Sequence, residues 1–548
     1  MGEGKSPLWY KNAVFYGVDI EKFQDSNGDG IGDFPGLTAR LDYLADLGVT
    51  CLWLLPFFPT PNRDNGYDVS DYYRIDPKLG TFEDFLTCIR KAGERGLRVM
   101  IDLVMDHSSD EHPWFQAARW DRHSRYRRYY FWTDAPPPME PGQGNIFPGE
   151  ESSVWTFDEA AGQYYYHQFY KFEPDLNVGC PDVQEEIKRV IDFWLSLGIS
   201  GFRVDAVSHM IDGPDVGAAP ASHDPHRILR DMRTFTSGRR EDAALLGEAD
   251  VAPDELKKYF GNGDEMHLLY NFLLDNYLFL GLATQQGEAI RRALRLLPSI
   301  PESGQWVNFL RNLDELDLER LSDKERALVF DVFAPDHNMR IFGRGIRRRL
   351  APMLKDRSRI ELAMSLLFSL PGAPLVMYGD EIGMGEDLSL EGRNAVRTPM
   401  QWSPECNGGF STAASDALAA PAITEGSFAY HHVNVQDQAK NPDSLLNWMK
   451  RLITVRRQCP EWGWGAVRVI ETSEPGLFAH ECEWKGNRLF AFHNLAAKSC
   501  SVRLPRERDI ILLPLLGTVQ PDFSSQSSTL EMDAYGFLWL RLTPRHGS

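Results

Sequence analysis

The sequence has few cysteines, and their placement is not typical of a secreted protein stabilised by disulfide bonds. The seven cysteines are an odd number, are scattered along the chain and include no CxxC pair, so a disulfide framework is disfavoured. No apolar run is long enough to cross a bilayer, and the opening MGEGKSPLWYKN does not resemble a signal peptide. These absences predict free thiols in a reducing compartment, so we expect a cytoplasmic protein with no membrane partner.

The sequence is also short of positive charge. Lys and Arg number 58 against 78 Asp and Glu, which gives a net charge of −20. Such a balance argues against a nucleic acid or an anionic membrane as partner and suits a neutral substrate. Repeats and low-complexity segments are missing too. What the chain does have is length, because 548 residues with 43% hydrophobic content can bury a large core in more than one domain.

The stretch GFRVDAV, residues 201–207, places opposite charges on one face of an apolar strand. Arg203 and Asp205 are two residues apart, and side chains at that spacing share a face of a strand. Burying charge is costly unless the charges are paired or used. The pattern alone leaves two interpretations open, a structural ion pair and an active-site pair.

Other apolar runs also end in carboxylates. RVMIDLVMDH carries Asp102, Asp106 and His107, ALLGEAD carries Glu248, and QWVNFLRNLD carries Asp314. In a barrel of parallel strands such ends converge on one mouth, where these barrels place their chemistry. Several carboxylates in this order predict one shared active site.

These segments resemble, in order, the four motifs of the α-amylase superfamily (glycoside hydrolase family 13): Asp102 with His107, GFRVDAV, GEAD and Asn312–Asp314. The resemblance covers nearly the whole chain. The segments DSNGDGIGD, EPDLN and RTPMQW are similar to those of the oligo-1,6-glucosidase and trehalose synthase branch. HPWFQAAR, IRRRLAP and DEIGMGED favour the trehalose synthase side of that branch.

The resemblance implies an α/β fold, a (β/α)8 TIM barrel with an inserted domain B and a C-terminal antiparallel β-sandwich. The expected ranges are 1–107 for the first part of the barrel, 108–178 for domain B, 179–465 for the remainder with an insertion after strand eight, and 466–548 for the sandwich. The strand–helix rhythm lapses after residue 107, and alternating runs such as RLFAFHNL and FLWLRL follow residue 470. Both observations agree with this division.

Two further expectations concern single segments of the barrel domain. The seventh strand is predicted over Gln305–Asp314. The basic run Arg347–Arg349 is predicted to lie in a polar insertion between the seventh strand and the helix that follows it, either on a solvated face or against acidic residues elsewhere in the protein.

The resemblance also implies the roles of the site residues. Asp205 is expected to be the nucleophile, Glu248 the acid and later the base, and Asp314 the third carboxylate, which grips the sugar hydroxyls. Arg203 is expected to keep Asp205 ionised. Further sugar contacts are expected from Asp64, Tyr67, His107 and Arg397.

The loop DSNGDGIGD predicts a structural metal site. Hard cations prefer several oxygen ligands from a loop that curls, and glycine permits the curl. An ordinary Asn/Asp/Gly turn is the alternative. With the family resemblance we expect calcium, or magnesium in its place, and no organic cofactor. The expected ligands are Asp25, Asn27, Asp29, the Ile31 carbonyl and Asp33.

The chain departs from the family pattern at two positions. Leu313 stands where the fourth motif has a histidine that donates to the sugar, and leucine has no donor to offer. Asp106 stands where the family has asparagine, which would make a second calcium site, if this chain has one, more anionic.

We expect an enzyme that acts on a small α-glucoside and interconverts maltose and trehalose through a glucosyl-enzyme intermediate. The alternatives are an α-glucosidase that hydrolyses short α-glucosides and, less favoured, a weakened barrel that serves as a binding module. The sequence leaves open whether identical copies assemble.

Overall fold

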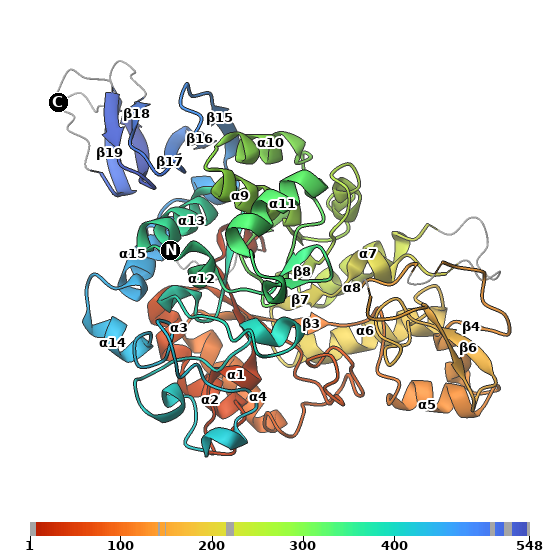
Figure 1. Ribbon diagram of the computed structural model, residues 1–548. Coiled ribbons are helices and arrows are strands. Elements are labelled where there is room, and N and C mark those ends of the chain that lie inside the picture. Colours follow the sequence, from red (N-terminus) through yellow and green to blue (C-terminus); the bar gives the residue numbers. More distant parts are fainter. Residues whose placement is uncertain are drawn as a thin grey trace.

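A computed structural model of the chain describes residues 7–140, 143–147, 149–214, 224–504, 510–519 and 529–544. Within these ranges, eight parallel strands close into a barrel in the order β1-β14-β10-β9-β8-β7-β3-β2, at the centre of Figure 1. The strands are β1 (Phe15–Val18), β2 (Cys51–Leu54), β3 (Arg98–Leu103), β7 (Gly201–Val204), β8 (Ala244–Gly247), β9 (Leu268–Tyr270), β10 (Gln305–Asn308) and β14 (Ala373–Met377). The expected TIM barrel is confirmed.

The barrel strands are apolar because both of their faces are buried. All residues of β1, β2, β7, β8 and β14 are buried, as expected for parallel strands covered by helices outside and filled by side chains inside. The covering helices include α3 (Leu41–Leu47), α4 (Phe82–Glu94), α6 (Pro181–Ser196), α8 (Arg227–Arg239), α9 (Phe272–Thr284), α13 (Arg357–Ser369) and α15 (Leu445–Arg457).

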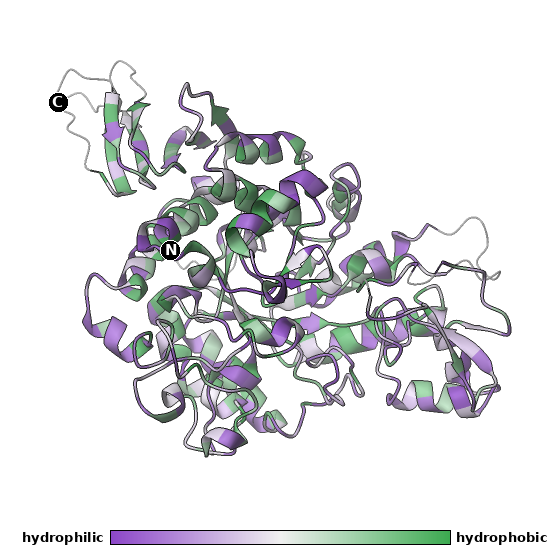
Figure 2. Cartoon of the chain, in the orientation of Figure 1, coloured by the Kyte–Doolittle hydropathy of each residue, from purple (hydrophilic) through white to green (hydrophobic). Residues whose placement is uncertain are grey.

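The covering helices pack against the barrel through apolar faces. In α6 the buried residues recur every three or four positions, from Val183 through Ile187 and Ile191 to Trp194, which makes one apolar stripe. Figure 2 shows hydrophobic and hydrophilic residues alternating along helices such as α6. Helix α4 starts at a capping box, in which Thr81 and Asp84 satisfy each other's backbone N–H groups.

The segment between β3 and α6 departs from the barrel. It contains α5 (Pro113–Trp120) and a three-stranded antiparallel sheet of β4 (Trp132–Thr133), β6 (Gln163–Tyr166) and β5 (Trp155–Asp158). It projects from one side of the barrel (Figure 1) and returns through a bridge between His107 and Asp175. We propose to treat this segment as domain B; residues 141, 142 and 148 lie outside the described part.

The C-terminal part is antiparallel, as expected. Strands β15 (Ala466–Ile470), β16 (Leu477–Trp484), β17 (Asn487–Asn494), β21 (Phe537–Pro544) and β19 (Ile510–Gly517) form one sheet, and β18 (Cys500–Arg503) pairs with β20 (Thr529–Met532). The larger sheet lies against α13, where Trp539 donates a 2.9 Å hydrogen bond to Ser365.

The predicted extent of the seventh strand is wrong. Strand β10 ends at Asn308, and Asn312–Asp314 lies in the following loop. Leu313 has φ 75°, a left-handed backbone conformation that a strand does not accommodate. The apolar run continues beyond the strand because the loop is itself buried.

In the basic run Arg347–Arg349, Arg348 and Arg349 are buried rather than on a solvated face. Arg348 pairs with Glu386 at 2.7 Å. The fully buried Arg349 donates to the carbonyls of Tyr378 and Val396 at 2.8 and 2.9 Å. Of the two interpretations, contact with acidic residues elsewhere is therefore the correct one for Arg348.

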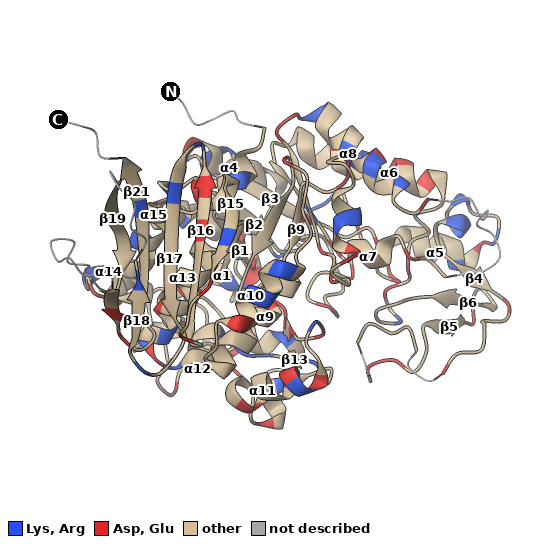
Figure 3. Cartoon of the chain, turned by 90° about the horizontal axis from the view of Figure 1, so that it is seen from above, with Lys and Arg blue, Asp and Glu red and all other residues tan. Residues whose placement is uncertain are grey.

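Lys and Arg are interspersed with Asp and Glu along helices such as α6 and α8 (Figure 3). Among the described residues, the helices all fall short of the length and apolar character that crossing a membrane requires.

Candidate active site

The carboxyl ends of the barrel strands and the segment between β3 and α6 enclose a cavity of about 390 Å³. Seven of the eight predicted catalytic and sugar-binding residues line it: Asp64, Tyr67, His107, Arg203, Asp205, Glu248 and Asp314. The eighth, Arg397, is buried behind the wall and donates to Asp314 at 2.7 Å. The structure thus brings together side chains that are far apart in the sequence.

Arg203 organises one side of this cavity. Its buried guanidinium donates to Asp102 at 2.7 Å and to Asp205, and it pairs with Glu248 at 2.7 Å. Trp53 donates to the other oxygen of Asp102 at 2.9 Å. The ion pair expected from GFRVDAV is therefore buried, and Asp205 also lines the cavity. The catalytic use of this pair stays a prediction.

The two carboxyl groups that share Arg203 have raised pKa values. Burial raises the pKa of Glu248 to about 7 against the opposing effect of Arg203. Burial also raises the pKa of Asp205, again opposed by Arg203. Glu248 is further fixed by a 3.1 Å bond from the backbone N–H of Ala206. Near neutral pH one of these neighbours can hold a proton and the other a charge, as acid–base chemistry requires.

Asp314 is held ionised on the opposite wall. Burial by itself would raise the pKa of Asp314, but Arg397, Arg393 and Arg203 lower it to about 2. Arg393 donates to Asp314 at 2.8 Å and also to Asp64. A carboxylate that stays charged at all working pH values is suited to accept hydroxyl hydrogen bonds rather than to exchange protons.

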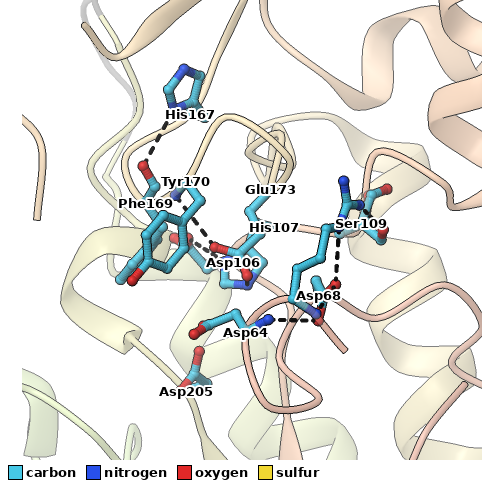
Figure 4. Close-up of polar contacts among 12 residues, drawn as sticks. Asp64, Asp68, Asp106, His107, Ser109, His167, Phe169, Tyr170, Glu173 and Asp205 are labelled. Atoms are coloured by element: carbon cyan, nitrogen blue, oxygen red, sulfur yellow. Dashed lines mark hydrogen bonds and ion pairs between the residues drawn. The ribbon is translucent and has the colours of Figure 1, made fainter. Parts of the chain in front are cut away.

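His107 lies between two carboxyl groups. Its Nδ1 is 3.2 Å from Asp106 and its Nε2 is 3.9 Å from Glu173, and Figure 4 shows this group with Asp64 and Asp205 beside it. Burial by itself would lower the pKa of His107, but Glu173 and Asp106 raise it to about 10. The imidazolium can therefore donate to an oxygen in the cavity.

The sequence analysis missed Arg393. Its guanidinium lies 4.9 Å from the ring of Tyr67 and bonds both Asp64 and Asp314, so it closes the cavity between two predicted sugar-binding carboxylates. Its spacing of four residues from Arg397 was visible in the sequence, but that spacing alone does not indicate where the side chain points.

Leu313 is fully buried and is not among the residues that line the cavity. A Cβ atom added to Gly17 of β1 would lie 3.1 Å from Leu313 Cδ1 and 3.1 Å from the ring of Trp53. The leucine therefore fills the barrel interior between β1 and β2. A donor at this position would have to turn away from that packing to reach the cavity.

The loop from Asp25 to Asp33 offers the oxygen chemistry of a hard-cation site. Gly28 and Gly30 have positive φ values of 82° and 93°, and the loop curls so that Asp25 accepts bonds from the backbone N–H groups of both glycines. Within the described residues, however, its three carboxylates do not converge within 4.8 Å of one another. The ligand types fit calcium, and calcium binding at this loop stays a prediction.

Removal of calcium is expected to lower stability without abolishing the chemistry, because the loop lines no part of the catalytic cavity. At free calcium 100 times Kd, the ion would stabilise the fold by about 2.7 kcal/mol. The measurement is the melting temperature with calcium and with a chelator. Asp29→Ser should reduce the calcium-dependent shift, while Asp331→Asn on the exposed face of α11 (Asp323–Phe333) should not. Equal shifts in the two variants would contradict this site.

A second acidic group does converge within 4.8 Å, namely Asp250, Asp317 and Glu319. These residues line the catalytic cavity near Glu248. Asp250 pairs with Arg320 at 3.0 Å and Asp317 with Arg344 at 2.7 Å. Because Arg320 and Arg344 between them pair with all three carboxyl groups, we treat the group as a polar wall of the cavity.

Comparison with known proteins agrees with this geometry. Residues 20–465 match the Alpha-amylase family, described as "Alpha amylase, catalytic domain". The chain is 40% identical to a trehalose synthase of Pimelobacter sp. (strain R48), over 98% of this chain and 97% of that one. It is also 40% identical to a trehalose synthase/amylase of Mycolicibacterium smegmatis, over 97% and 92%. The trehalulose synthase MutB of Pseudomonas mesoacidophila MX-45 has a similar structure, with a TM-score of 0.77, 25% identity and coverage of 98% and 99%. A family match over residues 20–465 and two relatives at 40% identity establish that this chain belongs to the α-amylase family of glycoside hydrolases.

Proposed function

We propose that the protein interconverts maltose and trehalose by transferring a glucosyl unit within one bound disaccharide. The observation that carries the proposal is the sharing of Arg203 by Asp205 and Glu248 inside one cavity. Two carboxyl groups on one guanidinium lie close together, as in retaining enzymes, where the separation is about 5–5.5 Å.

In the proposed first step, Asp205 attacks the anomeric carbon and the glycosidic bond breaks. Glu248 gives its proton to the leaving oxygen, so that free glucose and a glucosyl-Asp205 ester are formed. In the second step, Glu248 takes the proton of the 1-hydroxyl of the same glucose, and that oxygen displaces Asp205. The product is trehalose, and both anomeric centres keep their configuration.

The remaining residues would hold the glucosyl ring. Asp314 would accept hydrogen bonds from ring hydroxyls and strengthen them as positive charge develops at the anomeric carbon. His107 and Arg393 would donate, Asp64 would accept, and the ring of Tyr67 would give an apolar face. Arg397 would act through Asp314, to which it donates.

The choice of maltose and trehalose rests on the two relatives at 40% identity, whose names include trehalose synthase. The rival function is hydrolysis of short α-glucosides, for which the same residues serve with water as acceptor. A binding module without activity is disfavoured, because Asp205 meets in one cavity with Glu248, whose pKa is raised to about 7, and Asp314, whose pKa is lowered to about 2.

The test is an NMR time course of the purified protein with maltose, trehalose and sucrose supplied separately. Appearance of trehalose from maltose, and of maltose from trehalose, would support the proposal. Glucose as the sole product would favour the hydrolase, and no change in any sugar would favour the binding module.

The kcat/KM on maltose is expected to fall as the pH becomes alkaline, with a midpoint near pH 7. The acid must be protonated to react, and the pKa of Glu248 lies at about 7, so activity is lost as pH rises through that value. On α-glucosyl fluoride the alkaline fall should disappear, since fluoride leaves without a proton. A fall of the same shape on both substrates would contradict the assignment of Glu248.

We further propose a reducing, cytoplasmic location, which is supported by the fact that all seven cysteines are free thiols.

A further inference from the structure

Two buried histidines lie in the joint between the C-terminal sheet and the barrel. His480 of β16 and His493 of β17 are diagonal neighbours in the sheet, since His480 pairs in register with Ala491, and both side chains are 0% exposed. Their rings lie nearly parallel, with centroids 6.2 Å apart and planes at 9°. Two imidazoles at this separation inside an interface would repel each other strongly if both were charged.

The hydrogen bonds of the two rings suit neutral imidazoles. Nε2 of His480 donates at 2.9 Å to the carbonyl oxygen of Ser369 on α13. Nε2 of His493 is 3.0 Å from the hydroxyl of Ser365, which also accepts from the indole N–H of Trp539 at 2.9 Å. Among the described residues, Nδ1 of each ring has no hydrogen-bond partner. An imidazolium has two N–H groups, so in each protonated ring one buried N–H would lack an acceptor.

The rings are otherwise surrounded by aromatic side chains. Phe478 lies 5.2 Å from His480 and 6.2 Å from His493, Trp462 of α16 (Glu461–Trp464) lies 5.2 Å from His480, and Phe537 lies 6.4 Å from His493. Within the described part of the chain, neither ring forms an ion pair or a hydrogen bond with a charged or thiol group. Those groups, on the elements around the pair, are Arg357, Arg359 and Glu361 of α13, Arg456 and Cys459 with Glu461 of α16, Glu481, Cys482 and Glu483 of β16, Arg488 of β17 and Arg541 of β21.

Burial in this interface opposes protonation. It lowers the pKa of His480 to about 4 and holds the pKa of His493 well below its usual range, with the neighbouring His480 lowering the latter further. A histidine exposed by detachment of the sheet would have a pKa of about 6.5. The closed joint therefore binds fewer protons than the open one, so its stability is complete above about pH 6.5 and is lost as the pH falls below that value. At pH 5 each histidine would favour opening about thirtyfold, and the two together about 10³-fold.

We propose that the contact between the C-terminal sheet and α13 is an acid-sensitive joint, which stays closed while His480 and His493 are neutral and opens when they take up protons. The joint also reaches the last barrel strand. Trp462, which packs on His480, accepts at 3.1 Å from the backbone N–H of Gly372, directly before β14. Opening would therefore loosen the turn through which the chain enters β14. The joint acts independently of the substrate and of the proposed function.

The test follows the reaction of Cys482 with 4,4′-dithiodipyridine at pH 7.5 and at pH 5.0 by peptide mass spectrometry. Cys482 is fully buried, two residues from His480 on the same face of β16, so it becomes reactive when the joint opens. Each rate is divided by that of a short cysteine peptide, which removes the pH dependence of the thiol itself. The corrected rate should be up to about 10³-fold higher at pH 5.0. The corrected rate of Cys51, fully buried in β2 of the barrel, should not change.

Glutamine variants test the two histidines directly. His480→Gln and His493→Gln each replace a titrating ring by an amide that can still hydrogen-bond to α13. Each should reduce the acid response of Cys482 to about thirtyfold, and the double variant should abolish it. His432→Gln, at an exposed histidine, is the matched control and should keep the full response.

Three results would overturn the inference. The first is an acid response of Cys482 that is as large in the double variant as in the wild type. The second is an equal rise at Cys482 and Cys51, which would mean that acid opens the whole barrel. The third needs the wild type alone and so decides the matter even if the double variant does not fold: a corrected Cys482 rate that is the same at pH 7.5 and pH 5.0.

Discussion

Asp205→Asn and Glu248→Gln are each expected to lower kcat on maltose by about 10⁴-fold or more. The first change removes the carboxylate proposed to form the glucosyl ester, and the second removes the proton that the leaving oxygen needs. Both side chains keep their size, and both amides can still accept from Arg203, which now donates to Asp205 and pairs with Glu248. The measurement is the steady-state rate on maltose and on trehalose, with circular dichroism to show that each variant is folded.

α-Glucosyl fluoride separates the two roles. Glu248→Gln should still react with it in a first turnover, because fluoride leaves without protonation, whereas Asp205→Asn should not. Glu255→Gln is a suitable control, since Glu255 is partly exposed and pairs with Lys258, and neither residue lines the cavity. If Asp205→Asn consumed the fluoride and Glu248→Gln did not, the two roles would have to be exchanged.

Arg203→Gln is expected to lower the free energy of unfolding by about 3–5 kcal/mol, the usual cost of removing one partner from a buried ion network. The change leaves Asp102, Asp205 and Glu248 without their shared cation in a site where Arg203 itself is 1% exposed. Glutamine can replace one hydrogen bond but not the charge. Denaturant unfolding at pH 7 measures the effect.

Arg90→Gln serves as the comparison, since Arg90 forms an exposed pair with Glu94 on α4. Removing a surface pair of this kind changes stability by at most about 1 kcal/mol. Lowering the pH should reduce the difference in free energy of unfolding between Arg203→Gln and the wild type. The reason is that protonated carboxyl groups no longer need the cation. Equal losses in the two variants would show that the buried network contributes no more than a surface pair.

The family resemblance implied the barrel, whereas most of the residues around its mouth could be predicted from the sequence for a local reason. Each motif is an apolar strand followed by a polar side chain, and the parallel arrangement sends all such ends to one place. Asp102, Asp205 and Glu248 were found in this way, and the structure brings them to Arg203.

The sequence contains no comparable local pattern for contacts between separate insertions. Arg393 reaches Asp64 from a segment more than 300 residues later, and Phe342 stacks on Phe147, 195 residues earlier in the chain. Both contacts join irregular segments that are far apart in the sequence, and periodicity does not encode how such segments pack. The end of β10 was misplaced for a related reason, because burial of the loop around Leu313 continues the apolar pattern beyond the last strand residue.

The closure of the barrel by its first and last strands has a consequence for biosynthesis. Strand β1 pairs with β14, and Tyr16 of β1 donates to Glu381, 365 residues later in the chain. At about 5–20 residues per second, a ribosome needs roughly 20–70 s to make that partner. During this time one edge of the nascent sheet, in which Phe15 and Tyr16 are apolar, has no neighbour. An unpaired apolar edge invites pairing with other chains, so the nascent chain should depend on chaperones that shield β1 until β14 has emerged.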